Sequence, residues 1–524
     1  MRKDGRLSTI RDCGSCLSRR GFLAGCVGCA GAGTSLGGVI FGSQNTPRRL
    51  RLHVLFALHA PVQETPDWPN VGFDFRPVMQ RIQSELQRSC PQYDFIFSTA
   101  DGPEAAAGII EGSRPDSVDG YIVYQMNCWN RVVQSCAATG KPTLYLDFQY
   151  GGSGGFLVYT SSFLRTGSPN VGFVASSEFE DHVAAVQCFE VIQRGGSPAE
   201  FTAATERVRR ERTPGPGNLA ARSDEVAVLP PDEWRKRFRE AKILAVGGEE
   251  TPLGEAIEQE LGIAVVPMGF EELNEAWKNA DKDQAAEIAD RWQEAASKVE
   301  GVSREELENS AAMYLAEKAV LEKHDANAIT VNCLGGFYGG HIHAYPCLGF
   351  HELNNEGLVG GCECDVRSAA TMVVFTTLTQ GRPGYISDPV VDTSKRQIIY
   401  AHCVASNRPF GPAGAANEFE ILTHSEDRQG AAVRSLFPAG YMLTTVELGP
   451  DRKQILLHQA KSVGNSLDDR ACRTKLCAEP IGDIEKLFTE WDAWGWHRVT
   501  YFGDLKESVY ALADTLGWRV VEEA

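Results

Sequence analysis

The stretch Leu50-Arg51-Leu52-His53-Val54-Leu55-Phe56-Ala57-Leu58 decides the fold class, because an apolar run of this length predicts a buried β-strand. Apolar residues at helical spacing follow over Phe75–Cys90. Further strands are predicted at Asp94–Ser98, Gly120–Gln125, Thr143–Phe148 and Val171–Ala175. This alternation of strands and helices predicts a parallel sheet covered by helices. No GxGxxG or Walker-type loop follows the first strand, so a nucleotide site is not indicated.

The same pattern returns once and then changes. Residues 196–232 are charged and rich in proline, which predicts a linker or an excursion from the fold. A second α/β unit is predicted from strands at Ala241–Gly248, Ile263–Met268 and Ala328–Cys333. Beyond it, glycine-rich loops separate short β-rich runs at Gly384–Ser387, Gln397–Cys403, Phe419–Thr423 and Tyr441–Glu447.

The expected fold class is therefore α/β, with two Rossmann-like parallel-sheet α/β domains followed by a mixed, β-rich C-terminal domain. The expected boundaries are 1–42 for an N-terminal signal, 43–195 for the first α/β domain and 196–232 for the linker. The second α/β domain is expected at 233–335 and the C-terminal domain, with the functional site, at 336–524.

Composition excludes several classes of protein. The 524 residues are 43% hydrophobic, enough for ordinary cores, so a disordered chain is excluded. The net charge of −18 argues against a general nucleic-acid binder, which would carry a basic surface. The fifteen cysteines are an odd number in a long chain, so a closed disulfide framework is not implied.

The first 42 residues predict an export signal. Ser18-Arg19-Arg20-Gly21-Phe22-Leu23 precedes an uncharged, glycine-rich stretch, which is typical of a twin-arginine signal peptide. The expected partner is the twin-arginine translocation machinery, and the expected location is periplasmic or in the cell envelope. Leu23-Ala24-Gly25-Cys26 also fits a lipoprotein box, but too little apolar sequence precedes it. The pairs Cys13/Cys16 and Cys26/Cys29 would suggest zinc or iron–sulfur binding in a mature protein, but they fall within this signal.

Polar side chains gather in the C-terminal region. The segment Pro346–Leu358 is followed by Cys362-Glu363-Cys364-Asp365 and then a helix, which Asp365 is placed to cap. Gly384–Asp388 predicts a strand that ends in an acid, and Pro389 predicts that the chain leaves the sheet there. His402 stands near the end of the next strand, and His497 precedes a strand close to the C-terminus. Two carboxylates and two imidazoles suit a divalent hard-to-borderline metal, for which Mn²⁺ is the first choice and Mg²⁺, Fe²⁺, Co²⁺ or Zn²⁺ are alternatives.

These segments resemble the L-fucose isomerase/L-arabinose isomerase superfamily, particularly its fucose-isomerase-like branch. The matching pieces are Pro-Cys-Leu with Leu-Asn-Asn-Glu-Gly, Cys-Glu-Cys-Asp before a helix, the acid at the end of the next strand, and the late His-Arg-Val-Thr-Tyr-Phe-Gly-Asp. Order and approximate spacing agree over residues 328–524, and the earlier α/β units agree only in outline.

The resemblance implies an aldose–ketose isomerase that uses Mn²⁺ or a similar ion and acts through a cis-enediol. It implies that Glu363 and Asp388 are metal ligands and proton-transfer groups. His497 would be a further ligand, and His402 falls where arabinose isomerases, but not fucose isomerases, carry a ligand. His351, Asn354 and Asn355 could contact sugar hydroxyls or serve turn hydrogen bonding. Relatives form trimers or hexamers, so a homo-oligomer is expected.

Two departures keep alternatives open. Isomerases of this type work in the cytoplasm, whereas this chain carries an apparent export signal. Four cysteines lie close in sequence to the predicted site: Cys347, Cys362, Cys364 and Cys403. They are either small buried packing residues or thiolates that recruit a softer metal such as zinc. The alternative functions are an exported, non-catalytic sugar-binding protein and a relative with other metal-assisted carbohydrate chemistry.

Overall fold

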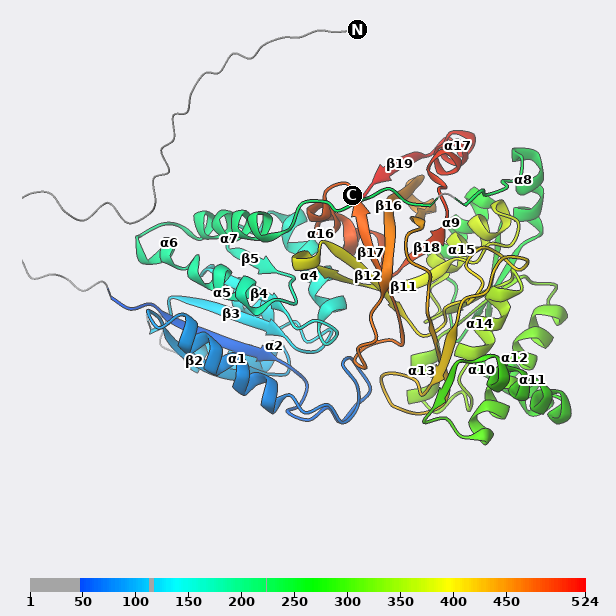
Figure 1. The fold of residues 1–524 in the computed structure, drawn as a ribbon, viewed down its shortest axis with the longest axis horizontal. Coiled ribbons are helices and arrows are strands. Elements are labelled where there is room, and N and C mark those ends of the chain that lie inside the picture. Colours follow the sequence, from blue (N-terminus) through cyan, green and yellow to red (C-terminus); the bar gives the residue numbers. More distant parts are fainter. Residues whose placement is uncertain (1–47, 113–116, 223) are drawn as a thin grey trace, which may run out of the picture. The chain divides into compact units, whose positions relative to one another are not determined.

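Figure 1 presents the chain as a computed structural model that describes residues 48–112, 117–222 and 224–524. The predicted signal peptide, lipoprotein box and both CxxC pairs lie outside these residues. Within the described segments, no helix combines the length and the apolar character needed to cross a membrane.

The first sheet is parallel and has the strand order β2-β1-β3-β4-β5. Its strands are β1 (Arg51–Ala57), β2 (Asp94–Ala100), β3 (Gly120–Gln125), β4 (Thr143–Asp147) and β5 (Val171–Val174). Its helices are α1 (Arg76–Ser89), α2 (Pro103–Gly112), α3 (Val132–Ala137), α4 (Ser153–Thr166), α5 (Phe179–Gln187), α6 (Glu190–Gln193) and α7 (Pro198–Arg212). Figure 1 shows this sheet in blue and cyan with helices beside it.

Alternate residues of β1 bury against different helices, as the two-residue period of a strand requires. Leu52, Val54 and Phe56 pack with residues of α1, α5 and α7. Leu55 and Ala57 pack with residues of α2, α3 and α4 on the other face. This second core also contains residues of the C-terminal sheet. Because each face of β1 is covered by a core, the strand is apolar on both faces.

The second sheet is also parallel, with the order β10-β9-β6-β7. Its strands are β6 (Lys242–Val246), β7 (Ala264–Met268), β9 (Ala328–Val331) and β10 (Val359–Cys362). The associated helices are α8 (Pro231–Glu240), α9 (Pro252–Leu261), α10 (Phe270–Lys278), α11 (Lys282–Ala295), α12 (Arg304–Lys323), α13 (Cys333–Tyr338), α14 (Cys347–Asn355) and α15 (Val366–Leu378). A small sheet with the order β14-β13-β8 joins this region to the C-terminal one.

The C-terminal sheet has the order β15-β18-β11-β12-β17-β16-β19, and a further pairing of β15 with β16 closes six of its strands into a barrel. The strands of this sheet are β11 (Tyr385–Asp392), β12 (Gln397–His402), β15 (Met442–Gly449), β16 (Gln454–Asn465), β17 (Thr474–Ile481), β18 (Arg498–Phe502) and β19 (Arg519–Glu522). The small sheet consists of β13 (Phe419–Leu422) and β14 (Ala432–Ser435) from the same region and β8 (Lys298–Glu300) from the second α/β region. Helices α16 (Leu487–Glu490) and α17 (Lys506–Leu516) lie near its end. The predicted fold class is confirmed: two parallel-sheet α/β regions precede a β-rich region.

Three local features differ from expectation or extend it. The strand at Asp388 does not end there, because β11 continues through Pro389 to Asp392. The pairing of β11 with β18 stops at Ser387, so at Pro389 the strand β11 pairs with β12 alone. Proline has no N–H to donate, and at this position no second strand needs that hydrogen bond.

The segment expected as a linker contains α7, and β10 joins the second sheet. The domain boundaries stay predictions, because the cores are continuous across them.

Candidate functional site

A cavity of about 1140 Å³ lies at the carboxyl ends of the two parallel sheets. His59 follows β1 and Cys128 follows β3, which is the point where the order of the first sheet reverses. Leu334 follows β9 and Glu363 follows β10 in the second sheet. Open α/β sheets bind ligands at such reversal points. The fold therefore directs the loops of both sheets into one cavity.

Glu363 is held in a tight turn between β10 and α15. Glu363 and Cys364 both have positive φ angles, of 60° and 53°, which non-glycine residues seldom adopt. The turn ends at Asp365, whose carboxylate accepts hydrogen bonds from the backbone N–H groups of Arg367 and Ser368 and caps α15, as predicted. The end of β10 on one side and the capped helix on the other thus fix the backbone of Glu363, from which its carboxylate extends.

The other three candidate ligands come from neighbouring strands of the barrel. Asp388 lies on β11 opposite Ala401 of β12, so His402 at the end of β12 is one residue away in register. His497 directly precedes β18, the other neighbour of β11. Glu363, Asp388, His402 and His497 offer ligand atoms that all lie within 4.8 Å of one another. The structure therefore brings together the four residues that the sequence singled out as metal ligands.

The electrostatics of this cluster depend on burial and on close charges. Burial raises the pKa of Glu363 well above its usual range, His497 opposes the rise, and Asp388 adds to it. Burial likewise raises the pKa of Asp388 to about 6, against the opposing charge of His497. For His497 burial is unfavourable to the charged form, but the hydrogen bond to Asp365 and the nearby carboxylates raise its pKa to about 10. Burial and the charge of His497 lower the pKa of His402 well below its usual value.

The donors of the cluster fit a divalent metal. The Nε2 atom of His497 lies 3.6 Å from Glu363 Oε2 and 3.5 Å from Asp388 Oδ1. In the described part of the chain, the buried Nε2 atoms of His402 and His497 have no hydrogen-bond partner. Buried polar atoms are normally satisfied, and an ion between these nitrogens and two carboxylates would satisfy both.

Surrounding side chains orient the candidate ligands. His497 Nδ1 donates to Asp365 Oδ2 at 2.9 Å, which leaves Nε2 to face the cluster. The indole Nε1 of Trp496 donates to Asp388 Oδ1. The Cys472 sulfur lies 3.9 Å from Asp388 Oδ2 and 4.0 Å from His402 Nδ1. These contacts are of the kind that fixes the tautomer and direction of metal-binding groups.

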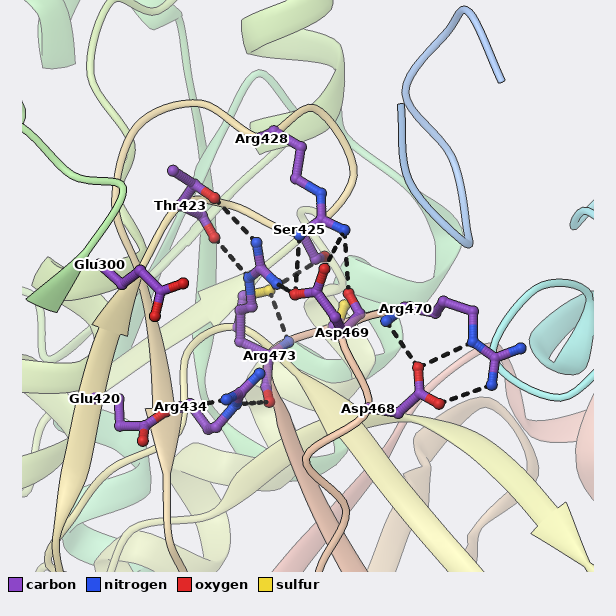
Figure 2. A network of polar contacts seen from close by, with 12 residues as sticks. Glu300, Glu420, Thr423, Ser425, Arg428, Arg434, Asp468, Asp469, Arg470 and Arg473 are labelled. Atoms are coloured by element: carbon purple, nitrogen blue, oxygen red, sulfur yellow. Dashed lines mark hydrogen bonds and ion pairs between the residues drawn. The ribbon is translucent and has the colours of Figure 1, made fainter. Parts of the chain in front are cut away.

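A network of arginines and aspartates holds the loop that carries Cys472 (Figure 2). Asp469 accepts from Arg428 and from Arg473, at 2.7 Å in each case. Arg473 also donates to the Thr423 carbonyl at 2.7 Å, and its backbone N–H donates to the Cys403 sulfur at 3.5 Å. The network joins the loop before β17 to the loop after β13. It therefore helps to hold Cys472 beside Asp388 and His402.

The cavity walls are aromatic and acidic. The rings of Trp129 and Trp496 lie 3.9 Å apart between centroids, and Trp129 is 47% exposed. Glu426 accepts from the Tyr338 hydroxyl at 3.0 Å, and burial raises its pKa to about 8. The acids that line the cavity are Glu64, Asp67, Asp101, Glu363, Asp365, Asp388 and Glu426.

The three predicted sugar-contacting residues lie elsewhere. His351 Nδ1 donates to the Ala405 carbonyl, and Asn355 bonds to His351 and accepts from Ser406. Asn354 exchanges two hydrogen bonds with the backbone of Gly360. None of the three is among the described residues that line the cavity. They brace α14 against its neighbours, and a role in substrate binding stays a prediction.

Sequence reasoning missed the contribution of the first sheet to the cavity. His59, Asp67 and Trp129 line it from loops after β1 and β3. His59 Nε2 lies 3.1 Å from Asp67 Oδ2, and this bond is the first cause that raises the pKa of His59. The signal was present, because polar and aromatic residues directly after parallel strands mark the edge of a sheet where ligands bind.

The cysteines near the site do not join the cluster. Among the described residues, the set that could hold an ion comprises Glu363, Asp388, His402 and His497 and includes no thiol. Cys347, Cys362 and Cys403 are buried, and Cys364 is partly exposed. The interpretation as small packing residues fits this placement better than recruitment of a softer metal by thiolates.

Comparisons with known proteins bear on the reaction class. No family model matches the chain. It is 25% identical over 306 residues to the sulfoquinovose isomerase of Clostridium sp. (strain MSTE9), covering 55% of this chain and 66% of that protein. It is 25% identical over 245 residues to the sulfoquinovose isomerase of Priestia aryabhattai, covering 44% and 52%.

The matches thus span between about half and two thirds of the relatives' lengths. A solute-binding protein of an ABC transporter from Aeropyrum pernix K1 is 10% identical over 62% of this chain and 70% of that one, with a TM-score of 0.15, too low to indicate a common fold. The expected resemblance is supported in part: this chain is weakly similar to proteins named as sugar isomerases, while its assignment to the fucose-isomerase-like branch stays a prediction.

Proposed function

We propose that the protein is a metal-dependent aldose–ketose isomerase, an intramolecular oxidoreductase that acts on an aldose or deoxyaldose. The observation that carries the proposal is the cluster of Glu363, Asp388, His402 and His497 beside a cavity of about 1140 Å³. The similarity to proteins named sulfoquinovose isomerase supports the same class of reaction.

The chain's own residues account for the proton movement. Conversion of an aldose to a ketose takes a proton from C2 and delivers one to C1 through a cis-enediol. Glu363 and Asp388 are two carboxylates in one cluster beside the cavity, and positioned carboxylates can take up and release protons. In this proposal, one carboxylate removes the C2 proton and returns it to C1, and the other takes the proton of the O2 hydroxyl and supplies one to O1. His497 Nε2 lies within 3.6 Å of both carboxylates, so the imidazole and the two acids face one point.

A divalent ion held by Glu363, Asp388, His402 and His497 would supply the Lewis acidity that stabilises charge on the sugar's O1 and O2. We propose Mn²⁺ as this ion, because two carboxylates and two imidazoles without a thiolate suit a hard-to-borderline metal. Asp365 keeps the His497 ring in the orientation that such binding needs.

The cavity favours an uncharged aldose over an anionic one. Of the described residues lining it, Arg367 is the one with a guanidinium or ammonium group, and that group already bonds to the Leu448 carbonyl and Asp451. A sulfonate or phosphate would face carboxylates such as Asp67 and Glu426, while the one guanidinium is already engaged, which costs affinity. The exposed face of Trp129 offers an apolar surface for the C–H face of a sugar ring. The substrate charge proposed here thus differs from that of sulfoquinovose.

The test is an assay of the purified protein with Mn²⁺ and a panel of neutral aldoses, deoxyaldoses and sulfonated or phosphorylated sugars, with ketose formation as the readout. We expect turnover of at least one neutral sugar and little of the anionic ones. Glu363→Gln and Asp388→Asn should each lower kcat by about 10²-fold or more, because each removes a proton-transfer group. Glu287→Gln is the matched control, since it makes the same kind of change at an exposed glutamate that does not line the cavity.

Two outcomes would contradict the proposal. The absence of turnover with every aldose, despite bound Mn²⁺, would favour a non-catalytic sugar-binding protein or other metal-assisted carbohydrate chemistry. Full activity of Glu363→Gln or Asp388→Asn would remove that residue from the mechanism.

We also propose that the protein is exported by the twin-arginine pathway to the periplasm or cell envelope and forms a homo-oligomer. The support for export is Arg19-Arg20 ahead of an uncharged stretch. Replacing both arginines with lysine should leave the chain in the cytoplasm, as cell fractionation would show. Export of that variant at the wild-type level would contradict the proposal.

A further inference from the structure

Two thiols meet directly behind the turn that carries Glu363. The sulfur atoms of Cys333 and Cys362 lie 3.1 Å apart, about 1 Å longer than a disulfide bond. Both side chains are buried, with exposed fractions of 2% and 4%. The pair therefore stands close to bonding distance without solvent between the sulfurs.

The backbone keeps the pair in this position. β9 and β10 are adjacent parallel strands, with Cys362 opposite Val331 in register. Cys362 is the last residue of β10, and Cys333 begins α13 two residues beyond Val331. Asn332 caps α13 by accepting from the Gly335 N–H at 3.1 Å, so the position of Cys333 is set by a strand end and a capped helix.

The pair is linked to the candidate metal site through the main chain. Glu363 directly follows Cys362. The Cys362 thiol lowers the pKa of the Cys333 thiol, and the backbone of Glu363 lies close enough to lower it further. Glu363 and Cys364 already adopt positive φ angles, so the turn has little freedom to absorb a change at Cys362. We therefore expect a shift of about 1 Å at Cys362 to move the Glu363 carboxylate through this turn.

We propose that Cys333 and Cys362 are a redox modification site: they form a reversible disulfide that displaces Glu363 and weakens metal binding at the cluster. The oxidant is a small peroxide, because the thiols are buried. One sulfur attacks the peroxide O–O bond, which releases water and leaves a sulfenic acid. The second thiol displaces the sulfenic hydroxyl as water and forms the S–S bond. Two thiols and one hydrogen peroxide thus yield one disulfide and two waters, with sulfur oxidised and oxygen reduced.

The first test locates the bond in the full-length protein. After treatment with hydrogen peroxide, blocking of remaining thiols and digestion without reductant, we expect a Cys333–Cys362 cross-linked peptide and a loss of two hydrogens in the intact mass. Cleavage after glutamates and aromatic residues places Cys333, Cys347, Cys362 and Cys364 on separate peptides, because Phe337, Glu356 and Glu363 lie between them. Oxidation at other cysteines with this pair still reduced would overturn the proposal.

The second test measures Mn²⁺ binding by titration and needs no turnover, so a failed isomerase assay leaves it intact. Peroxide should weaken Mn²⁺ binding by at least about tenfold, and dithiothreitol should restore it, because ligand displacement of about 1 Å is costly. Cys333→Ser and Cys362→Ala should each abolish the peroxide effect. Cys136→Ser, a buried cysteine in the core that the first sheet shares with the C-terminal sheet, is the matched control and should keep it. Equal Mn²⁺ affinity before and after formation of the disulfide would overturn the link to Glu363.

Discussion

Asp365 contacts two structures at once, a helix and the imidazole of a candidate metal ligand. Its Oδ1 atom accepts from the N–H groups of Arg367 and Ser368, and its Oδ2 atom accepts from His497. Sequence reasoning identified the first role from the position before a helix, but the second depends on a strand far away in the chain. A residue that orients a ligand is therefore difficult to identify from the sequence when a local role, such as helix capping, already accounts for its presence.

Replacing Asp365 with serine separates the two roles. A serine still caps a helix but is too short to reach His497. We expect Mn²⁺ affinity to fall by about 10- to 100-fold with little change in the free energy of unfolding. Ser303→Ala, which removes the cap of α12, should do the reverse and cost about 1 kcal/mol without changing Mn²⁺ affinity. Titration with Mn²⁺ and urea denaturation measure the two effects, and unchanged affinity in Asp365→Ser would refute the orienting role.

Glu317 is a buried acid that the proposed mechanism does not use. It lies on α12 with its side chain wholly buried, and neither carboxylate oxygen has a hydrogen-bond partner among the described residues. An added Cβ on Gly349 of α14 would lie 2.0 Å from Glu317 Oε2, so the side chain fills the space over that glycine. Burial raises the pKa of Glu317 well above its usual value.

The folded state therefore retains a proton on Glu317 that the unfolded chain loses above a pH of about 4.3. Stability from this group is complete below that pH and declines as pH rises toward the folded-state pKa, by up to about 1.4 kcal/mol per unit. Glu317→Gln should thus gain stability over the wild type as pH increases from 5 to 7, as urea denaturation would measure. The exposed Glu287→Gln is the control for loss of one carboxylate. A difference that stays constant with pH would contradict the raised pKa.

At the scale of elements, apolar strands were predictable and elements hidden by charge were not. The predicted strand at Gly120–Gln125 matches β3, and Phe75–Cys90 contains α1, because burial imposes a clear period on these segments. α7 was overlooked because charged residues obscured its apolar face, although Phe201 and Ala204 pack in the core. Its signal was Ser197 with Glu200, which form a capping box in the structure.

The candidate site shows the same division. Glu363 and Asp388 could be named as candidate ligands because each stands at a turn or on a strand near other polar residues. Their roles in metal binding and proton transfer came from the resemblance. The cavity wall from the first sheet was not identifiable, since Asp67 and Trp129 belong to loops without a local period. Their proximity to Glu363 follows from how two sheets face one cavity, which no local pattern records.

At the scale of the molecule, the barrel encloses a charged network. Arg498 donates to Glu523 at 2.8 Å, and His458 bonds to the same carboxylate at 2.9 Å, with these side chains fully buried. Burial alone would raise the pKa of Glu523, but the charge of Arg498 and the bond to His458 lower it. The network links β16, β18 and the segment after β19 inside the closed sheet.

Glu523→Ala should therefore lower the free energy of unfolding by about 3–5 kcal/mol, because it leaves Arg498 buried without its partner. Glu522→Ala, which removes a partly exposed partner of Lys506, should cost no more than about 1 kcal/mol. The paired change of Arg498 and Glu523 to methionine should recover much of the loss, since no unpaired charge remains. Chemical denaturation compares the variants, and equal losses for Glu522→Ala and Glu523→Ala would refute this view of the barrel.

The position of β11 between β12 and β18 has a consequence for folding. β12 follows β11 directly, but β18, which His497 precedes, is made much later in the chain. Pairing of such distant segments is slow, because a long loop must close before the contacts form. We therefore expect the four candidate ligands to come together late in folding, when the barrel closes. An ion at this site would be bound only by the folded protein. Binding would therefore stabilise the folded state and slow its unfolding.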